Sequence, residues 1–302
     1  MKNFLKLLVK LSILAILGIG LFKSYGLYKQ NLLGRSMSKK APLLVELPFV
    51  IIIPAQNPGL LVEKTLISAL SQNYSNFRVI YLDDKSTDGS FEQVQALIQF
   101  LKKEDKTLLL QNERPQGTLK NIHQTVLGCD SREIVVIVRA CDFLAHEEVL
   151  NKLNTLYSNP FTWMTYGNYL NYPSYKQMPI HCKEFPKNIV FNNAYRSLTI
   201  PPLCPLTFYA GLFKEIPLED FLYKGKFIQI DAPLAYELPL LEISGTHAHF
   251  VNEILYLYNQ KDLKTTPSEI LHFLQNLPKQ EKLKSLPFIY QKNSEKNFRE
   301  KI

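Results

Sequence analysis

Two stretches of the sequence decide the fold: residues 49–59 read FVIIIPAQNPG, and residues 77–89 read FRVIYLDDKSTDG. The apolar, mostly β-branched start of the first stretch predicts a buried strand, and the Asn, Pro and Gly that follow it favour a turn. Residues 60–70 have helical spacing, and the second stretch predicts another strand that ends in an acidic turn. Two parallel strands joined by a helix form a βαβ unit, and ligands bind beyond the carboxyl ends of such strands. We therefore expect a nucleotide at this edge of the sheet.

Length and charge limit the classes of protein to consider. The chain has 302 residues, of which 46% are hydrophobic, so it can bury one sizeable core. The formal net charge is +8, but residues 1–40 contain 8 Lys and Arg residues and no Asp or Glu, which leaves the remainder formally neutral. A neutral domain without a basic stripe argues against binding to nucleic acid, so we expect no such partner.

The basic excess accompanies an apolar N-terminal segment. Residues 4–22 are mostly apolar and are interrupted by Lys6 and Lys10, which lie near one end and can snorkel to the membrane surface. We expect residues 1–24 to form a membrane-anchor helix with a single span, followed by a basic linker over residues 25–47. A cleaved signal peptide and a helix lying in the membrane interface are the alternatives.

Strand and helix patterns continue to alternate after the acidic turn. Residues 107–110 and 133–138 predict strands, and the apolar periodicity of residues 91–101 and 119–127 predicts helices. This alternation predicts an α/β domain over residues 48–260, followed by a C-terminal helical tail over residues 261–302. The four cysteines show no paired spacing, which favours isolated reduced thiols over disulfides.

Three separated motifs resemble the start of the family 2 glycosyltransferases. The motifs are the Ile-Ile-Pro-Ala-Gln-Asn run that ends at Asn57, the segment from Thr65 to Tyr74, and the acidic turn at residues 83–89. They occur in the family's order and spacing. The resemblance implies a GT-A fold, which is a Rossmann-like α/β fold with a mostly parallel central sheet, and a nucleotide-sugar donor.

The resemblance also implies roles for single residues. The residues expected to bind the nucleotide sugar at the ends of the first two strands are Pro54, Asn57, Asp83 and Asp84. Arg114 lies in a loop of the kind that passes the nucleotide, and its guanidinium suits the base or the pyrophosphate. Asp231 would be the general base that accepts the proton of the acceptor hydroxyl.

The residues after the fourth predicted strand depart from the family pattern. The family places Asp-x-Asp-Asp here, to hold a divalent cation against the donor's diphosphate. This chain has Arg139 and Cys141 in place of two of the acids, and only Asp142 remains. Asp142 is therefore the candidate ligand for Mg²⁺ or Mn²⁺. Arg139 is a further candidate for nucleotide-sugar binding, because its charge could partly replace the cation.

The resemblance implies an inverting glycosyltransferase that acts on a hydroxyl of a glycan or lipid acceptor, in cell-envelope glycan synthesis. Because nucleotide sugars are cytosolic, it places the domain on the cytoplasmic side of a bacterial inner membrane. The lost acids, and a His/Arg pair that the family places before Thr207 and this chain lacks, leave a second hypothesis. In that hypothesis the chain is an inactive GT-A protein that binds a partner or a glycan. The sequence leaves both hypotheses open.

Overall fold

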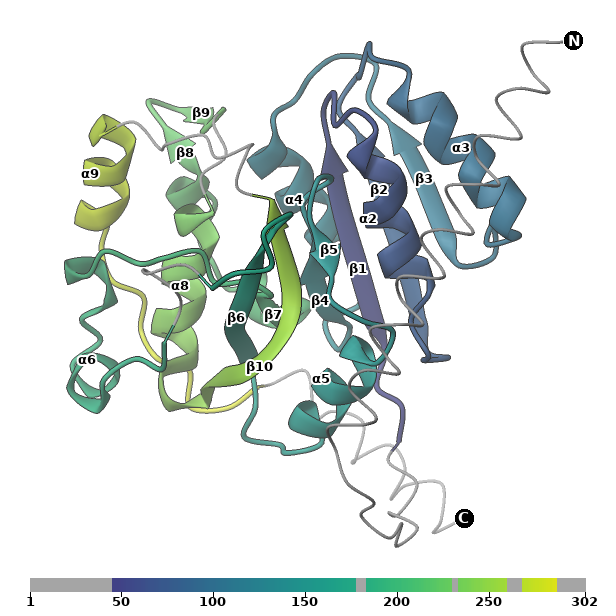
Figure 1. Ribbon diagram of the computed structural model, residues 1–302. Coiled ribbons are helices and arrows are strands. Elements are labelled where there is room, and N and C mark those ends of the chain that lie inside the picture. Colours follow the sequence, from purple (N-terminus) through teal and green to yellow (C-terminus); the bar gives the residue numbers. More distant parts are fainter. Residues whose placement is uncertain (1–44, 178–182, 230–232, 260–267, 287–302) are drawn as a thin grey trace, which may run out of the picture. The chain divides into compact units, whose positions relative to one another are not determined.

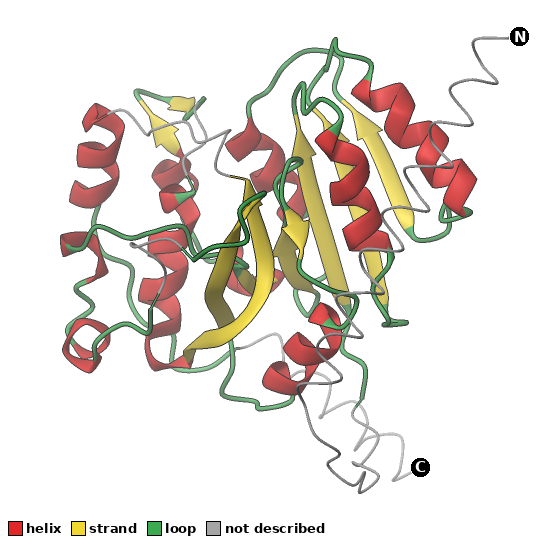
Figure 2. Ribbon diagram, viewed as in Figure 1, coloured by secondary structure: helices red, strands yellow, loops and turns green. Residues whose placement is uncertain are grey.

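The computed structural model describes residues 45–177, 183–229, 233–259 and 268–286. These residues form a large twisted sheet with helices packed on its faces (Figure 1, Figure 2). The order of the strands across the sheet is β3-β2-β1-β4-β7-β6-β10-β5. The strands are β1 (Phe49–Ala55), β2 (Phe77–Asp83), β3 (Thr107–Gln111), β4 (Ile134–Ile137), β5 (Phe143–Leu144), β6 (Met164–Tyr172), β7 (Thr207–Tyr209) and β10 (Ala248–Asn259).

The first half of the sheet is the parallel βαβ array that the sequence predicted. The helices that connect its four strands are α2 (Leu61–Leu70), α3 (Ser90–Leu101) and α4 (Thr118–Leu127). Crossover connections between parallel strands are right-handed, so the steps from β1 to β2 and from β2 to β3 place α2 and α3 on one face. The chain then returns past β1 to form β4, which places α4 on the opposite face (Figure 1).

Among the described strands of the large sheet, those that reverse direction all lie in its second half. Strand β7 lies antiparallel between β4 and β6, and β5 lies antiparallel to β10 at the far end. Strand β10 is parallel to β6, so both run in the same direction as β1. The carboxyl ends of β1, β2, β4, β6 and β10 therefore share one edge of the sheet, which we call the carboxyl edge.

Strand β1 lies at the centre of the core. All seven of its residues are buried: β2 and β4 flank the strand, α4 packs on one face of it, and α2 lies on the opposite face of the sheet (Figure 1). Phe49 packs edge-on against Tyr74 and Tyr157, with ring centroids 5.4 and 6.3 Å apart. A central strand that is buried on both faces needs apolar residues at consecutive positions, which explains why the run at its start does not alternate with polar residues.

A set of shorter elements packs beside the second half of the sheet. Its helices are α5 (Val149–Tyr157), α6 (Lys187–Phe191), α7 (Ala210–Phe213), α8 (Leu234–Ser244) and α9 (Ser268–Asn276), with a small hairpin of β8 (Leu222–Tyr223) and β9 (Lys226–Phe227). Helix α8 is almost wholly buried, and its Glu242 forms a buried ion pair with Arg196, with Arg196 Nε 2.6 Å from the carboxylate. Arg196 also donates to the carbonyl of Leu274, which ties α9 to the body of the fold.

The predicted membrane anchor at residues 1–24 and the linker up to residue 44 lie outside the described residues. Within the described ranges, no helix combines the length and the apolar character that crossing a bilayer requires.

Candidate functional site

The turns after β1 and β2 are locked together at the carboxyl edge. The backbone N–H of Asn57 donates to Ser86 Oγ at 2.9 Å, and Asn57 Oδ1 accepts from the N–H of Thr87 at 2.8 Å. The N–H of Gly59 donates to Asp88 at 2.8 Å. Asn57 has a φ of 48°, a left-handed conformation that Asn tolerates better than most residues. The predicted Asn57 thus shapes the edge through turn-to-turn hydrogen bonds, next to buried Pro54 in β1.

Asp84 holds the loop at residues 112–117 in place. Its Oδ1 accepts from Asn112 Nδ2 and from the N–H of Gln116, both at 2.7 Å, and its Oδ2 accepts from the N–H of Gly117 at 2.8 Å. Burial raises the pKa of Asp84, but these donors and Asn121 outweigh it, so that the pKa lies below its usual value. In this structure the carboxylate of Asp84 therefore orders the neighbouring loop.

Asp83 differs from Asp84 in having an unused acceptor. Its side chain is fully buried at the carboxyl end of β2, and Oδ2 accepts from the N–H of Ser86 and from Gln111 Nε2, at 2.9 and 3.1 Å. Oδ1 has no hydrogen-bond partner among the described residues. Buried carboxylate oxygens are costly to leave unpaired, so such an atom at a strand end indicates a position where a ligand can donate a hydrogen bond.

Arg139 and Asp142 form a close ion pair just after β4. Arg139 Nε donates to Asp142 Oδ2 at 2.6 Å, and Arg139 Nη2 donates to Oδ1 at 2.9 Å and to the carbonyl of Asn259 at 3.1 Å. The guanidinium also lies 4.2 Å from the ring centroid of Tyr258, in cation–π geometry. Burial alone lowers the pKa of Arg139, but the bond to Asp142 raises it above its usual value, so the guanidinium stays charged.

Strand β10 completes the surroundings of Asp142. The hydroxyl of Tyr256 donates to Asp142 Oδ2 at 2.8 Å, and the N–H of Asn259 donates to Oδ1 at 2.7 Å. Burial raises the pKa of Tyr256 well above its usual value, and the charge of Asp142 raises it further, so the hydroxyl stays protonated as a donor. Sequence reasoning missed Tyr256, Tyr258 and Asn259, because nothing local in the sequence connects them with a residue more than 110 positions earlier.

The predicted metal site does not fit this geometry. An ionised carboxylate has about four lone-pair positions, and those of Asp142 receive donors from Arg139, Tyr256 and the backbone of Asn259. The place beside the carboxylate is filled by a guanidinium, which repels a divalent cation. In the described ranges, no three His, Cys, Asp or Glu residues come together in a way that suits a metal ion. As placed here, Asp142 offers no free lone pair to Mg²⁺ or Mn²⁺.

Arg114 and Asp231 are the remaining predicted site residues. Arg114 is exposed on the loop that Asp84 organises, and its carbonyl accepts from Gln116 Nε2 at 3.2 Å. Asp231, the predicted base, lies outside the described residues. Gln229, the last described residue before it, approaches Gly117 so closely that a Cβ at Gly117 would be 3.1 Å from Gln229 Oε1. The two roles stay predictions.

His247 and His249 lie at the edge of the sheet opposite the carboxyl edge. His247 precedes β10, and its ring stacks on Trp163 with centroids 3.8 Å apart, whereas Asp142 bonds the far end of the same strand. His249 Nε2 lies 3.3 Å from the carbonyl of Phe161. The length of β10 separates this pair from Asp142, so the three residues do not share a site.

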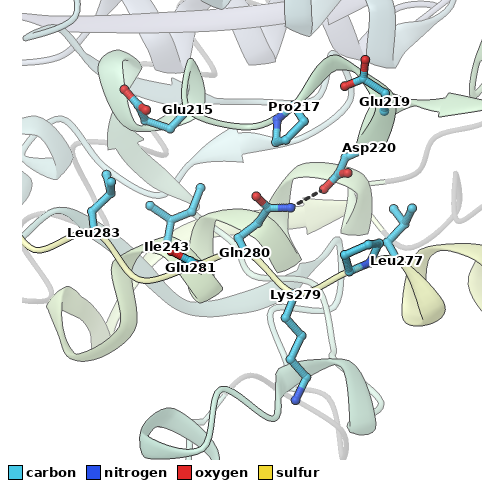
Figure 3. Close-up of a pocket in the computed structure, with 11 residues that line it drawn as sticks. Glu215, Pro217, Glu219, Asp220, Ile243, Leu277, Lys279, Gln280, Glu281 and Leu283 are labelled. Carbon is cyan, nitrogen blue, oxygen red and sulfur yellow. Dashed lines mark hydrogen bonds between the residues drawn. The ribbon is translucent and has the colours of Figure 1, made fainter.

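A cavity of about 510 Å³ lies elsewhere, between the segment before β8 and the segment after α9 (Figure 3). Glu215, Glu219 and Asp220 line one side, and the other side carries Gln280, whose Nε2 donates to Asp220 Oδ2 at 2.9 Å. None of the predicted site residues lines this cavity. The candidate site is therefore the carboxyl edge at β1, β2 and β4.

Comparison with known proteins identifies the family of this chain. The family model for glycosyl transferase family 2 matches residues 50–202 of this chain. An uncharacterized glycosyltransferase of Haemophilus influenzae is 29% identical over 119 residues, which make up 39% of this chain and 46% of that protein. The match thus spans about half the length of that relative.

Solved structures share the architecture. Residues 1–349 of S. aureus TarS, in complex with UDP-GlcNAc, superpose with a TM-score of 0.54 at 15% identity, over 72% of this chain and 60% of that chain. GalNAc-T7 with UDP, GalNAc and Mn²⁺ superposes with a TM-score of 0.52 at 14% identity, over 74% of this chain and 45% of that chain. At these identities the likeness shows the fold alone, and it confirms the architecture expected from the sequence.

Proposed function

Because this chain belongs to glycosyl transferase family 2, we propose that it transfers a sugar from a nucleotide-sugar donor to a hydroxyl group of an acceptor. The observation that carries the proposal is the convergence of Asn57, Asp83 and Arg139 at the carboxyl ends of β1, β2 and β4. The strand order reverses at β1, between β2 and β4, and open α/β sheets bind their ligands at such a switch point.

The donor nucleotide occupies the half of the edge next to β2. The buried Oδ1 of Asp83 lacks a partner among the described residues, so an N–H of the base or a ribose hydroxyl would satisfy it. Asp84 and the ordered loop at residues 112–117 support this half, and Arg114 on that loop faces solvent, where it can meet the base or the pyrophosphate. The diphosphate then extends toward the loop after β4.

The acceptor hydroxyl attacks the anomeric carbon with inversion, the bond from that carbon to the diphosphate breaks so that the nucleoside diphosphate leaves, and Asp231 accepts the proton of the hydroxyl. A carboxylate suits this role because it needs only to take the proton that the hydroxyl releases in the transition state. The position of Gln229 against Gly117 supports this assignment, since Gln229 is two residues before Asp231 and lies beside the loop at residues 112–117. A glycan or lipid at the bacterial inner membrane is the acceptor that we propose, with the domain on the cytoplasmic side, where nucleotide sugars are available. Recovery of the full chain outside the membrane fraction would contradict the membrane association.

Nucleotide binding tests the proposal directly. We would titrate the full chain with UDP, GDP, CDP and dTDP by calorimetry, with and without Mn²⁺, and repeat the titration with Asp83→Asn. The asparagine must keep its oxygen toward Ser86 and Gln111, so its NH₂ replaces the free acceptor. Losing a hydrogen bond to a charged group costs about 1.5–3 kcal/mol, which corresponds to a roughly 10- to 150-fold weaker affinity.

Asp130→Asn is the matched control, because Asp130 is exposed at the opposite edge of the sheet, just before β4. It should leave the affinity for the nucleotide unchanged. If no nucleotide binds with or without Mn²⁺, the transferase proposal fails and the inactive GT-A protein remains. A nucleotide that binds equally well to Asp83→Asn would instead refute the place assigned to the base or ribose.

A further inference from the structure

The positively charged guanidinium of Arg139, which lies beside Asp142, distinguishes this site from a metal site. Arg139 and Asp142 together carry no net charge, so the loop after β4 presents a neutral pair to an approaching diphosphate. Without Arg139, the buried carboxylate would repel that diphosphate. Because this reasoning concerns the donor's phosphates, it rests on the proposed function.

The guanidinium is held in a fixed position and is still accessible. The bidentate bond to Asp142, the bond to the Asn259 carbonyl and the ring of Tyr258 hold three sides of the group. Its Nη1 makes no hydrogen bond within the described part of the chain, and 21% of the Arg139 side chain is exposed. A preorganised guanidinium with a free N–H suits a phosphate oxygen, since such charge-assisted bonds are short and directional.

We propose that this protein binds the diphosphate of its donor without a divalent cation, and that Arg139 supplies the positive charge. Asp142 is then a positioning residue. It orients the guanidinium through two parallel hydrogen bonds, and Tyr256 and the N–H of Asn259 hold it in turn. When the nucleoside diphosphate departs, Arg139 stabilises its charge in the same position.

Three measurements on the full chain test this. The first titrates it with Mn²⁺ alone, and we expect no saturable binding at the site. The second compares UDP and GDP in EDTA and in Mn²⁺, and we expect dissociation constants within about threefold of each other. The third uses Arg139→Gln/Asp142→Asn, which removes both charges together and so leaves no unpaired buried carboxylate. We expect nucleoside diphosphates to bind about 10- to 100-fold more weakly to it, and uridine and guanosine to bind as before.

Arg132→Gln is the matched control, because Arg132 precedes β4 and Arg139 follows it, at opposite edges of the sheet. Thermal unfolding tests whether the double variant is folded. If it is not folded, the first two measurements still test the inference, because they use the unaltered chain. Nucleotide binding that requires Mn²⁺ would overturn the inference while leaving the proposed function in place. Binding that is independent of metal and unchanged in the double variant would overturn the role of Arg139. Absence of nucleotide binding under every condition would refute the proposed function itself.

A gain of metal binding gives an independent check. The variant Arg139→Asp/Cys141→Asp removes the guanidinium and adds two carboxylates beside Asp142. We expect this variant to bind Mn²⁺ and its affinity for UDP or GDP to become dependent on Mn²⁺. If the unaltered chain already binds Mn²⁺ as tightly as this variant, the guanidinium does not exclude a cation and the inference is wrong.

Discussion

Replacing Asp84 with asparagine should destabilise the protein and loosen the loop at residues 112–117. Asp84 is 2% exposed and accepts three hydrogen bonds from that loop, at 2.7, 2.7 and 2.8 Å. Two of the three donors are backbone N–H groups of Gln116 and Gly117, so the carboxylate determines the path of the main chain as well as the positions of side chains.

The magnitude follows from the number of donors that asparagine can satisfy. Its single oxygen can keep the donors of Asn112 and Gln116, but its NH₂ then faces the N–H of Gly117. The loss of one charge-assisted hydrogen bond costs about 1.5–3 kcal/mol, and a buried N–H without a partner costs about 1–3 kcal/mol. Because Gln116 and Gly117 are only half-buried, water relieves part of this cost. We expect a loss of about 3 kcal/mol in the free energy of unfolding.

Thermal unfolding followed by circular dichroism at pH 7.5 measures the loss. For a domain of this size each kcal/mol shifts the Tm by roughly 2–4 °C, so we expect a decrease of about 6–12 °C. Hydrogen exchange should show faster exchange of the amides of Gln116 and Gly117. Because the pKa of Asp84 is lowered on folding, its stabilisation is present above its unfolded pKa and lost as the pH falls through the folded pKa. The difference between the two proteins should therefore narrow below about pH 4.

Asp88→Asn is the control for charge removal in the same turn. Asp88 also accepts three hydrogen bonds, from Gly59 and from the backbone and hydroxyl of Ser90, but it is exposed. Its replacement should cost about 1 kcal/mol. If Asp84→Asn lowers the Tm no more than Asp88→Asn, or leaves exchange at Gly117 unchanged, the buried carboxylate does not organise the loop and the reasoning fails.

Three other substitutions test the surrounding structure. Arg196→Met leaves the Glu242 carboxylate buried without its partner and should cost about 3–5 kcal/mol, whereas Arg196→Met/Glu242→Leu should recover part of that loss in chemical denaturation. Burial lowers the pKa of His123, which packs against three phenylalanine rings, so the unfolded state takes up the proton more readily. Stability should therefore fall as the pH drops below about 6.5, and His123→Phe should remove that part of the pH dependence. Gly117→Ala introduces a side chain at a φ of 89° and should cost about 1–2 kcal/mol, with a measurable decrease in Tm.

The sequence predicted the first half of the fold well and the contacts within the candidate site only in part. The alternation of strands and helices predicted every element from β1 to β4 to within a few residues, because burial pattern and turn chemistry are local properties. The same pattern placed Asn57, Asp83 and Arg139 after strand ends, which was sufficient to expect them at one edge. It did not show that the carboxylate of Asp84 binds the loop at residues 112–117, since that depends on donors 28 to 33 residues away.

The sequence alone determined the β1–α2–β2 unit and the change of charge after β4, because each is written in a short run of residues whose physical preferences act locally. Only the tertiary structure decided what Arg139 and Asp142 do. Strand β10 pairs with β5, the strand that begins directly after Asp142, and this pairing brings Tyr256, Tyr258 and Asn259 to the ion pair. His247 directly precedes the start of β10, so the length of that strand separates it from Asp142. Such partners are chosen by the packing of a sheet across more than 110 residues of sequence, and no local pattern records that choice.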